Sequence, residues 1–123
     1  MKNYASYIGQ RKDRTTKNSI LKETALNETE FKVVFVRHGQ SLWNKQGKFS
    51  GWIDVPLNET GESEAIKAGQ DLKDAGYHFD IAHTSMLSRA HKTCSLIIRQ
   101  MGIQDTIHVN RSWRINERHY GML

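Results

Sequence analysis

The chain has 123 residues, of which 37% are hydrophobic and 25% charged, and this profile is typical of one small water-soluble domain. No stretch reaches the roughly 18 consecutive apolar residues of a membrane span, and Cys94 is the only cysteine, which excludes an intramolecular disulfide and favours a reducing compartment. The formal net charge of +5 suits an anionic partner, and a phosphorylated metabolite, a nucleic acid or an acidic surface would all qualify.

Residues 1–30 differ in composition from the rest of the chain. Apolar residues are sparse there, and bases outnumber acids. We expect a solvated, poorly ordered N-terminal extension, with an organellar targeting segment as the alternative. A secretory signal is not expected because no apolar run of about 7–15 residues follows Lys2. A cytoplasmic protein is therefore predicted.

An alternation of strands and helices begins at Phe31. Residues 31–36 (FKVVFV) form a short β-branched run, which is typical of a strand buried on both faces of a parallel sheet. Residues 79–83 and 107–109 predict two further strands. The order predicts an α/β fold with three αβα layers, a mostly parallel sheet and right-handed crossovers.

Two helices are expected between these strands. Thr60 can cap the first helix, which ends at Gly76. Thr84 or Ser85 can cap the second, which ends at Gly102. The apolar stripe of the second helix comprises Leu87, Ala90, Cys94, Ile97, Ile98 and Met101.

Charged side chains follow the carboxyl end of each predicted strand. Residues 37–39 (RHG) follow the first strand, Arg89 lies soon after the second, and residues 113–120 (WRINERHY) follow the third. Open α/β sheets bind their ligands at this edge. We therefore expect these side chains to converge on one site.

The residue types at this edge predict phosphoryl transfer. The guanidinium groups of Arg37 and Arg89 can hold a phosphoryl group, and the neutral imidazole of His38 is a nucleophile. Glu117 can carry a proton to or from a substrate oxygen. Gly39 lets the chain turn after the nucleophile and leaves room for a substrate.

Metal and nucleic acid are not expected as partners. The histidines lack metal-ligand spacing, and Cys94 lacks a second thiol. Trp43, Trp52 and Trp113 are expected to pack within the protein rather than to stack on bases. The phosphate-binding arginines accompany a nucleophile and an acid, which nucleic-acid binding does not require.

The motifs resemble a known family. Residues 36–44 (VRHGQSLWN) resemble the Arg-His-Gly signature of the histidine phosphatase superfamily. Residues 49–54 (FSGWID), 57–61 (LNETG) and 84–90 (TSMLSRA) follow in the order and spacing of one of its branches. Residues 113–121 (WRINERHYG) resemble the cofactor-dependent phosphoglycerate mutases and their relative, bisphosphoglycerate mutase.

The resemblance implies that His38 becomes phosphorylated, that Arg37 and Arg89 hold the phosphoryl group, and that Glu117 gives and takes the proton. It implies interconversion of 3-phosphoglycerate and 2-phosphoglycerate in glycolysis and gluconeogenesis, primed by 2,3-bisphosphoglycerate, without metal, in a cytoplasmic homo-oligomer. Further contacts to phosphate and substrate are implied for Ser41, Asn44, Ser50, Gly51, Arg118, His119 and Tyr120.

Two departures from the family pattern stand out. Gln40 replaces a common Glu, which removes a charge but keeps hydrogen-bonding capacity. The sequence ends at Leu123, whereas the family continues well beyond this point. We therefore expect residues 31–123 to be the N-terminal half of a catalytic domain that is inactive alone.

Three alternatives remain open at this point. They are a bisphosphoglycerate mutase, a phosphatase of the same superfamily, and a non-catalytic anion-binding fragment. The run ERHY at residues 117–120 argues against a phosphatase, because phosphatase branches usually place their acid differently.

Overall fold

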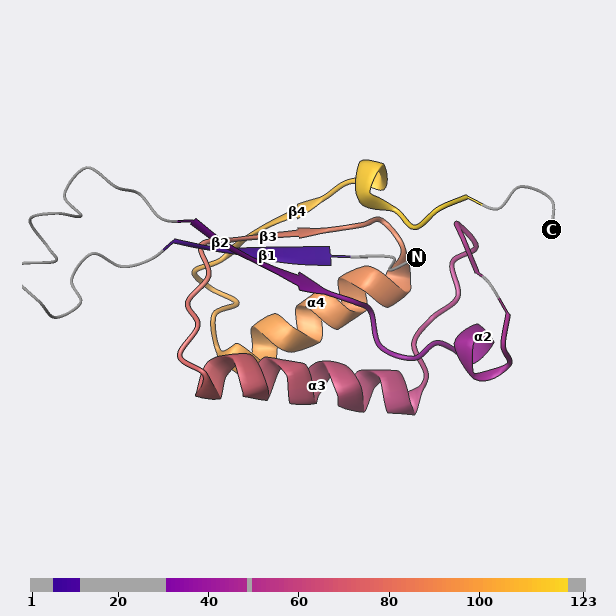
Figure 1. Ribbon diagram of the computed structural model, residues 1–123, viewed down its shortest axis with the longest axis horizontal. Coiled ribbons are helices and arrows are strands. Elements are labelled where there is room, and N and C mark those ends of the chain that lie inside the picture. The colour runs from indigo at the N-terminus through magenta and orange to yellow at the C-terminus, as the bar shows by residue number, and fades with distance from the viewer. Residues whose placement is uncertain (1–5, 12–30, 49, 120–123) are drawn as a thin grey trace, which may run out of the picture.

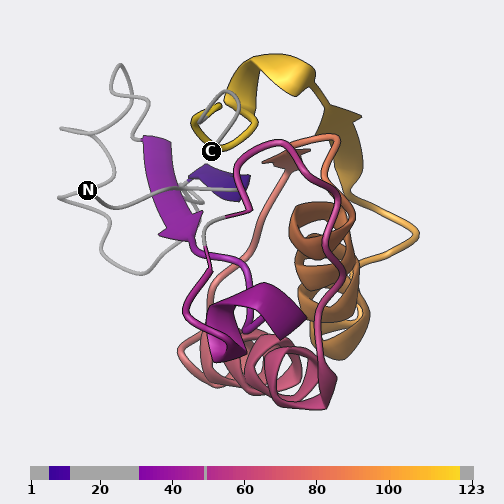
Figure 2. The same ribbon diagram turned by 90° about the vertical axis from the view of Figure 1, so that its right-hand side faces the viewer.

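The computed structural model describes residues 6–11, 31–48 and 50–119. They form an α/β fold in which two long helices lie on one side of a four-stranded sheet (Figure 1; a second view is given in Figure 2), and the predicted α/β class is confirmed. The elements in chain order are β1 (Ser6–Arg11), β2 (Phe31–Val36), α2 (Leu42–Lys45), α3 (Glu59–Asp74), β3 (Ile81–Thr84), α4 (Ser88–Met101), β4 (His108–Arg111) and the short 3-10 helix η1 (Trp113–Ile115).

The strands are arranged in the order β2-β1-β3-β4. β1 is antiparallel to β2 and to β3, whereas β3 and β4 are parallel. β2, β3 and β4 therefore run in one direction, as the sequence predicts for its strands.

β1 lies within the segment for which we expected a solvated extension. Residues 6–11 form a strand between β2 and β3 instead. The backbone of this strand supplies hydrogen-bond partners for the N–H and C=O groups along the edges of β2 and β3. Residues 1–5 and 12–30 of that segment lie outside the described residues.

The hydrophobic core lies between the sheet and α4. Every position predicted for the apolar stripe of α4 is buried. α3 packs along α4 in turn, and Gly69 permits this close approach, because a Cβ there would lie 2.9 Å from the Cβ of Gln100. The main cluster of the core consists of Phe79, Ala82, Cys94, Ile97, Ile98 and Met101.

The opposite face of the sheet is open along β2. Val34 and Val36 pack against the core, but Phe31, Val33 and Phe35 point the other way and are 73%, 51% and 57% exposed. The expectation that this strand is buried on both faces is therefore wrong, because both long helices lie on the same side of the sheet (Figure 1). The described residues supply two of the three expected layers.

The N-terminal cap of α3 differs from the prediction. The Asn58 side chain accepts a hydrogen bond from the Gly61 amide at 2.8 Å and caps the helix, whereas Thr60 lies inside its first turn. The glycine signals at the C-terminal ends are confirmed. Gly76 and Gly102 have φ values of 79° and 73°, a left-handed conformation that favours glycine.

The cap of α4 also differs from the prediction. The helix starts after Leu87, and neither Thr84 nor Ser85 is its N-cap residue. The Asp54 carboxylate, from a distant loop, accepts a hydrogen bond from the Ser88 amide at 2.6 Å. A hydrogen bond from the Ser88 side chain, followed by this amide bond, lowers the pKa of Asp54 below its usual value.

Candidate active site

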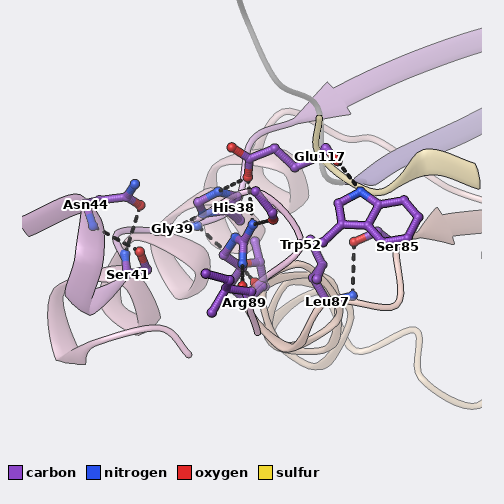
Figure 3. A network of polar contacts seen from close by, with 12 residues as sticks. His38, Gly39, Ser41, Asn44, Trp52, Ser85, Leu87, Arg89 and Glu117 are labelled. Carbon is purple, nitrogen blue, oxygen red and sulfur yellow. Dashed lines mark hydrogen bonds and ion pairs between the residues drawn. The ribbon is translucent and has the colours of Figure 1, made fainter. Parts of the chain in front are cut away.

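Three of the predicted catalytic side chains meet beyond the carboxyl ends of β2 and β3 (Figure 3). His38 follows β2, Arg89 lies in the first turn of α4, and Glu117 follows η1. Arg89 Nη2 donates to Glu117 Oε2 at 2.8 Å, and the same oxygen is 3.7 Å from His38 Nε2. Segments far apart in the chain thus bring an imidazole, a guanidinium and a carboxylate together.

Arg89 is completely buried and well paired. It donates to the carbonyl oxygens of Gly51 and Ile53, as well as to the Glu117 carboxylate. A guanidinium keeps its charge at any working pH, so burial requires such acceptors. The contacts fix the plane and direction of the guanidinium before any ligand binds.

The surroundings of His38 determine which of its ring nitrogens carries the hydrogen. Nδ1 of this buried ring is 2.7 Å from the Gly39 carbonyl oxygen. A carbonyl oxygen only accepts hydrogen bonds, so Nδ1 carries the hydrogen, and a neutral ring has its lone pair on Nε2. Nε2 is also the nitrogen that faces the Glu117 carboxylate.

Glu117 is held in its charged form. Burial by itself would raise its pKa, but its polar contacts with His38 and Arg89, together with the positive charge of Arg89, outweigh burial and lower the pKa to about 2. At neutral pH the carboxylate is therefore ionised, and it can accept a proton but not donate one.

Arg37, Ser41 and Asn44 do not contact this cluster. Arg37 is exposed and forms no ion pair with another described residue. The Ser41 hydroxyl accepts from the Asn44 amide, and the Asn44 side chain accepts from the Ser41 amide, both at 3.1 Å. This reciprocal pair caps α2, a short helix that we did not predict, and it lies to one side of His38 in Figure 3.

The remaining predicted contacts divide into two groups. Ser50 and Gly51 are buried near Arg89, and no described residue forms a hydrogen bond with the Ser50 hydroxyl. Arg118 and His119 are exposed at the end of the described chain, and Tyr120 lies outside the described residues. An incoming oxyanion could satisfy the Ser50 hydroxyl.

Trp52 holds the segment that carries Glu117. Its Nε1 donates to the Glu117 backbone carbonyl at 2.6 Å, and its ring lies 6.2 Å from that of Trp113 and 5.4 Å from that of His119. We expected Trp52 and Trp113 to pack within the protein. Their rings contact each other but stay 44% and 57% exposed, and the indole hydrogen bond of Trp52 is an additional, positioning contact. Sequence spacing gives no signal for it.

Thr93 and Gly39 connect the loop after β2 to α4. The Thr93 hydroxyl accepts from the Gly39 amide at 3.2 Å and donates to the Arg89 carbonyl at 2.7 Å. A Cβ on Gly39 would collide with the backbone of Gly61. The glycine is thus required for packing against α3, and the room that it leaves for a substrate stays a prediction. The position of Thr93, one turn after Arg89, is the signal that could have identified it.

Among the described residues, no three histidine, cysteine or acidic side chains are grouped so that they could hold a metal. Within the same residues, no helix has the length and apolar character needed to span a bilayer.

Residues 33–123 match the family model described as the histidine phosphatase superfamily, branch 1. The chain is 54% identical over 93 residues to the 2,3-bisphosphoglycerate-dependent phosphoglycerate mutases of Borreliella burgdorferi and Borrelia garinii subsp. bavariensis. The match covers 76% of this chain, and the chain spans only 37% of the length of these curated relatives.

Similar solved structures include phosphatases. A mycobacterial glucosyl-3-phosphoglycerate phosphatase superposes with a TM-score of 0.59 at 28% identity, over 69% of this chain and 38% of that one. A phosphoserine phosphatase from Entamoeba histolytica, in complex with 3-phosphoglyceric acid, gives 0.56 at 27% identity, over 69% and 39%.

Proposed function

Because the chain belongs to the histidine phosphatase superfamily, branch 1, we propose that it transfers a phosphoryl group through a phosphohistidine at Nε2 of His38. The observation that carries the proposal is the convergence of this nitrogen with the buried Arg89 and the ionised Glu117. The proposed reaction is the interconversion of 3-phosphoglycerate and 2-phosphoglycerate, supported by the 54% identity to phosphoglycerate mutases.

The proton balance follows from the charge of Glu117. When a substrate hydroxyl attacks the phosphorus of phospho-His38, the N–P bond breaks and Nε2 regains its lone pair. The hydroxyl proton passes to the Glu117 carboxylate. In the reverse step, Nε2 attacks a phosphate ester, and protonated Glu117 returns the proton to the leaving oxygen.

Arg89 stabilises the charge on the phosphoryl oxygens during both steps. Both hydrogens of its Nη2 already go to Gly51 and Glu117, so a phosphoryl oxygen replaces one of these acceptors, on a planar, permanently charged donor that a lysine does not offer. In this proposal Arg37, at the end of β2, supplies a second positive charge. Ser41, Asn44, Ser50, Gly51, Arg118, His119 and Tyr120 complete the substrate contacts.

When bound, 2,3-bisphosphoglycerate supplies the phosphoryl group that primes His38. The buried Ser50 hydroxyl, without a partner in the described part of the chain, and the fixed charge of Arg89 fit a phosphate ester at this position. A cytoplasmic homo-oligomer that acts on phosphoglycerates, and not on nucleic acid, completes the proposal.

Labelling tests the first step directly. We expect incubation with ³²P-labelled 2,3-bisphosphoglycerate to give an acid-labile label on His38. The label should be lost in His38→Ala and kept in His108→Ala, whose exposed ring lies on β4 and is 3.0 Å from the Asn110 side chain. Arg89→Lys should slow labelling by more than about tenfold, which corresponds to about 1.4 kcal/mol. Equal labelling of wild type and His38→Ala would contradict the proposal.

A phosphatase is the second candidate, because both solved structures described above are phosphatases. In that case water attacks phospho-His38 instead of a substrate hydroxyl. ³¹P NMR of the chain with 3-phosphoglycerate and 2,3-bisphosphoglycerate separates the two reactions. Formation of 2-phosphoglycerate supports the mutase, and release of inorganic phosphate without it supports the phosphatase.

A further inference from the structure

A hollow of about 610 Å³ lies between α4 and β4. None of its lining residues belongs to the His38, Arg89 and Glu117 cluster. Its polar and charged lining includes Thr84, His91, Ser95, Arg99, Gln104 and Arg111.

Thr84 places an unsatisfied polar group at this hollow. The residue is 1% exposed, and its Oγ1 atom has no hydrogen-bond partner among the residues that the structure describes. A buried hydroxyl almost always has a partner, and leaving it without one destabilises the fold. The Thr84 hydroxyl is therefore a donor in the wall of the hollow that lacks an acceptor among the described residues.

The charge around the hollow is positive. Arg99 and Arg111 are exposed, and neither forms an ion pair within residues 6–11, 31–48 and 50–119. The lining contains no aspartate or glutamate. Burial, followed by the charge of Arg111, lowers the pKa of His91, while Asp54 acts in the opposite direction. Arg111 is therefore close enough to influence the wall formed by α4.

The wall of the hollow also has an apolar part. Ile98 and Val109 line it, and Val109 is 41% exposed. His91, Ser95 and Arg99 follow at intervals of four residues, so they lie along one side of α4. Cationic, hydroxyl and apolar groups thus face the same space.

We propose that this hollow binds a small amphipathic oxyanion, a phosphate ester or a carboxylate, at a site separate from the phosphoryl-transfer site. The anionic group lies between Arg99 and Arg111 and accepts a hydrogen bond from the Thr84 hydroxyl. The apolar part of the ligand covers Ile98 and Val109.

Amide NMR titrations of the full chain at constant ionic strength test this site. The probes are phenyl phosphate and, separately, benzoate. We expect saturable shifts at residues 95–99 and 108–111, and the probe that binds more tightly identifies the preferred anion. Arg111→Gln should weaken binding by about tenfold, whereas Lys92→Gln, an exposed α4 cation outside the lining, should change it less than about twofold.

Thr84→Val separates a binding role from a structural one. Valine removes the unpaired hydroxyl while keeping the shape, so we expect a higher Tm together with weaker binding of phenyl phosphate. A lower Tm with unchanged binding would contradict the proposal. So would shifts confined to residues 37–44, or an Arg111→Gln variant that binds as tightly as wild type.

His38→Ala tests whether binding in the hollow is independent of the proposed phosphohistidine chemistry. The variant should show the same shifts at residues 95–99 and 108–111 as wild type, even though it cannot be phosphorylated. Loss of these shifts in His38→Ala would mean that the probe reports on the phosphoryl-transfer site and would overturn the proposal.

Discussion

Arg89 and Arg99 lie on the same helix, yet their surroundings are opposite. Arg89 is completely buried and donates to two carbonyl oxygens and a carboxylate, whereas Arg99 is exposed and unpaired in the described part of the chain. A buried guanidinium is oriented in advance, so little conformational entropy is lost when it binds a ligand. An exposed one must be ordered by its ligand. The phosphoryl-transfer site is therefore preorganised, and the α4–β4 hollow is adaptable.

Arg89→Met tests this contrast with the largest expected effect. The substitution leaves the half-buried Glu117 charge without its main partner, so we expect a loss of about 3–5 kcal/mol in the free energy of unfolding. Arg99→Met on the same helix is the matched control, and its effect should stay within about 0.5 kcal/mol. Urea denaturation measures both values, and similar losses would contradict the contrast.

Gly39→Ala tests how closely the His38 loop is fitted to the helices. The new Cβ collides with the Gly61 backbone, so we expect a loss of about 2–3 kcal/mol in stability. Gly47→Ala meets no neighbouring atom but adds strain at φ 70°, and it should cost only about 1 kcal/mol. A smaller loss for Gly39→Ala than for Gly47→Ala would show that the loop is loosely held.

Glu117→Gln tests the ion pair between Arg89 and Glu117 through the pH dependence of stability. The folded-state pKa of about 2 lies below the ordinary value of 4.5, so the ion pair stabilises the fold above about pH 5 and loses this effect as the pH falls toward 2. Wild type should exceed Glu117→Gln by about 2 kcal/mol at pH 7, with a smaller difference at pH 4. Urea denaturation at both pH values measures it, and a constant difference would argue against the ion pair.

Trp52→Phe should give the smallest effect. It removes the indole donor to the Glu117 carbonyl but keeps an aromatic ring, so we expect a loss of about 1 kcal/mol. Trp113→Phe should lose less, because the Trp113 indole forms no hydrogen bond with another described residue. Thermal unfolding of both variants checks this order.

The parts of the fold that depend on local pattern could be predicted from sequence. The α4 stripe follows from helical spacing, and Gly102 stops that helix because its φ is positive. The meeting of His38, Arg89 and Glu117 follows from the rule that parallel strands end at one edge.

The remainder depends on contacts between distant segments. Asp54 reaches the start of α4 from 34 residues away, and Trp52 reaches the Glu117 carbonyl across 65 residues. The sequence of β1 has no sustained apolar pattern, and pairing with β2 and β3 determines its position. No periodic pattern within these segments encodes such pairings.

The apolar side chains on the open face of β2 have a practical consequence in solution. Phe31, Val33 and Phe35 alternate along one strand and present a continuous water-facing stripe. Sulfate and other kosmotropic salts favour removal of such surface from water, so they should salt out this chain readily. We expect light scattering from the protein to be lowest in dilute, sulfate-free buffer. We expect ammonium sulfate to precipitate the protein at low concentrations of the salt.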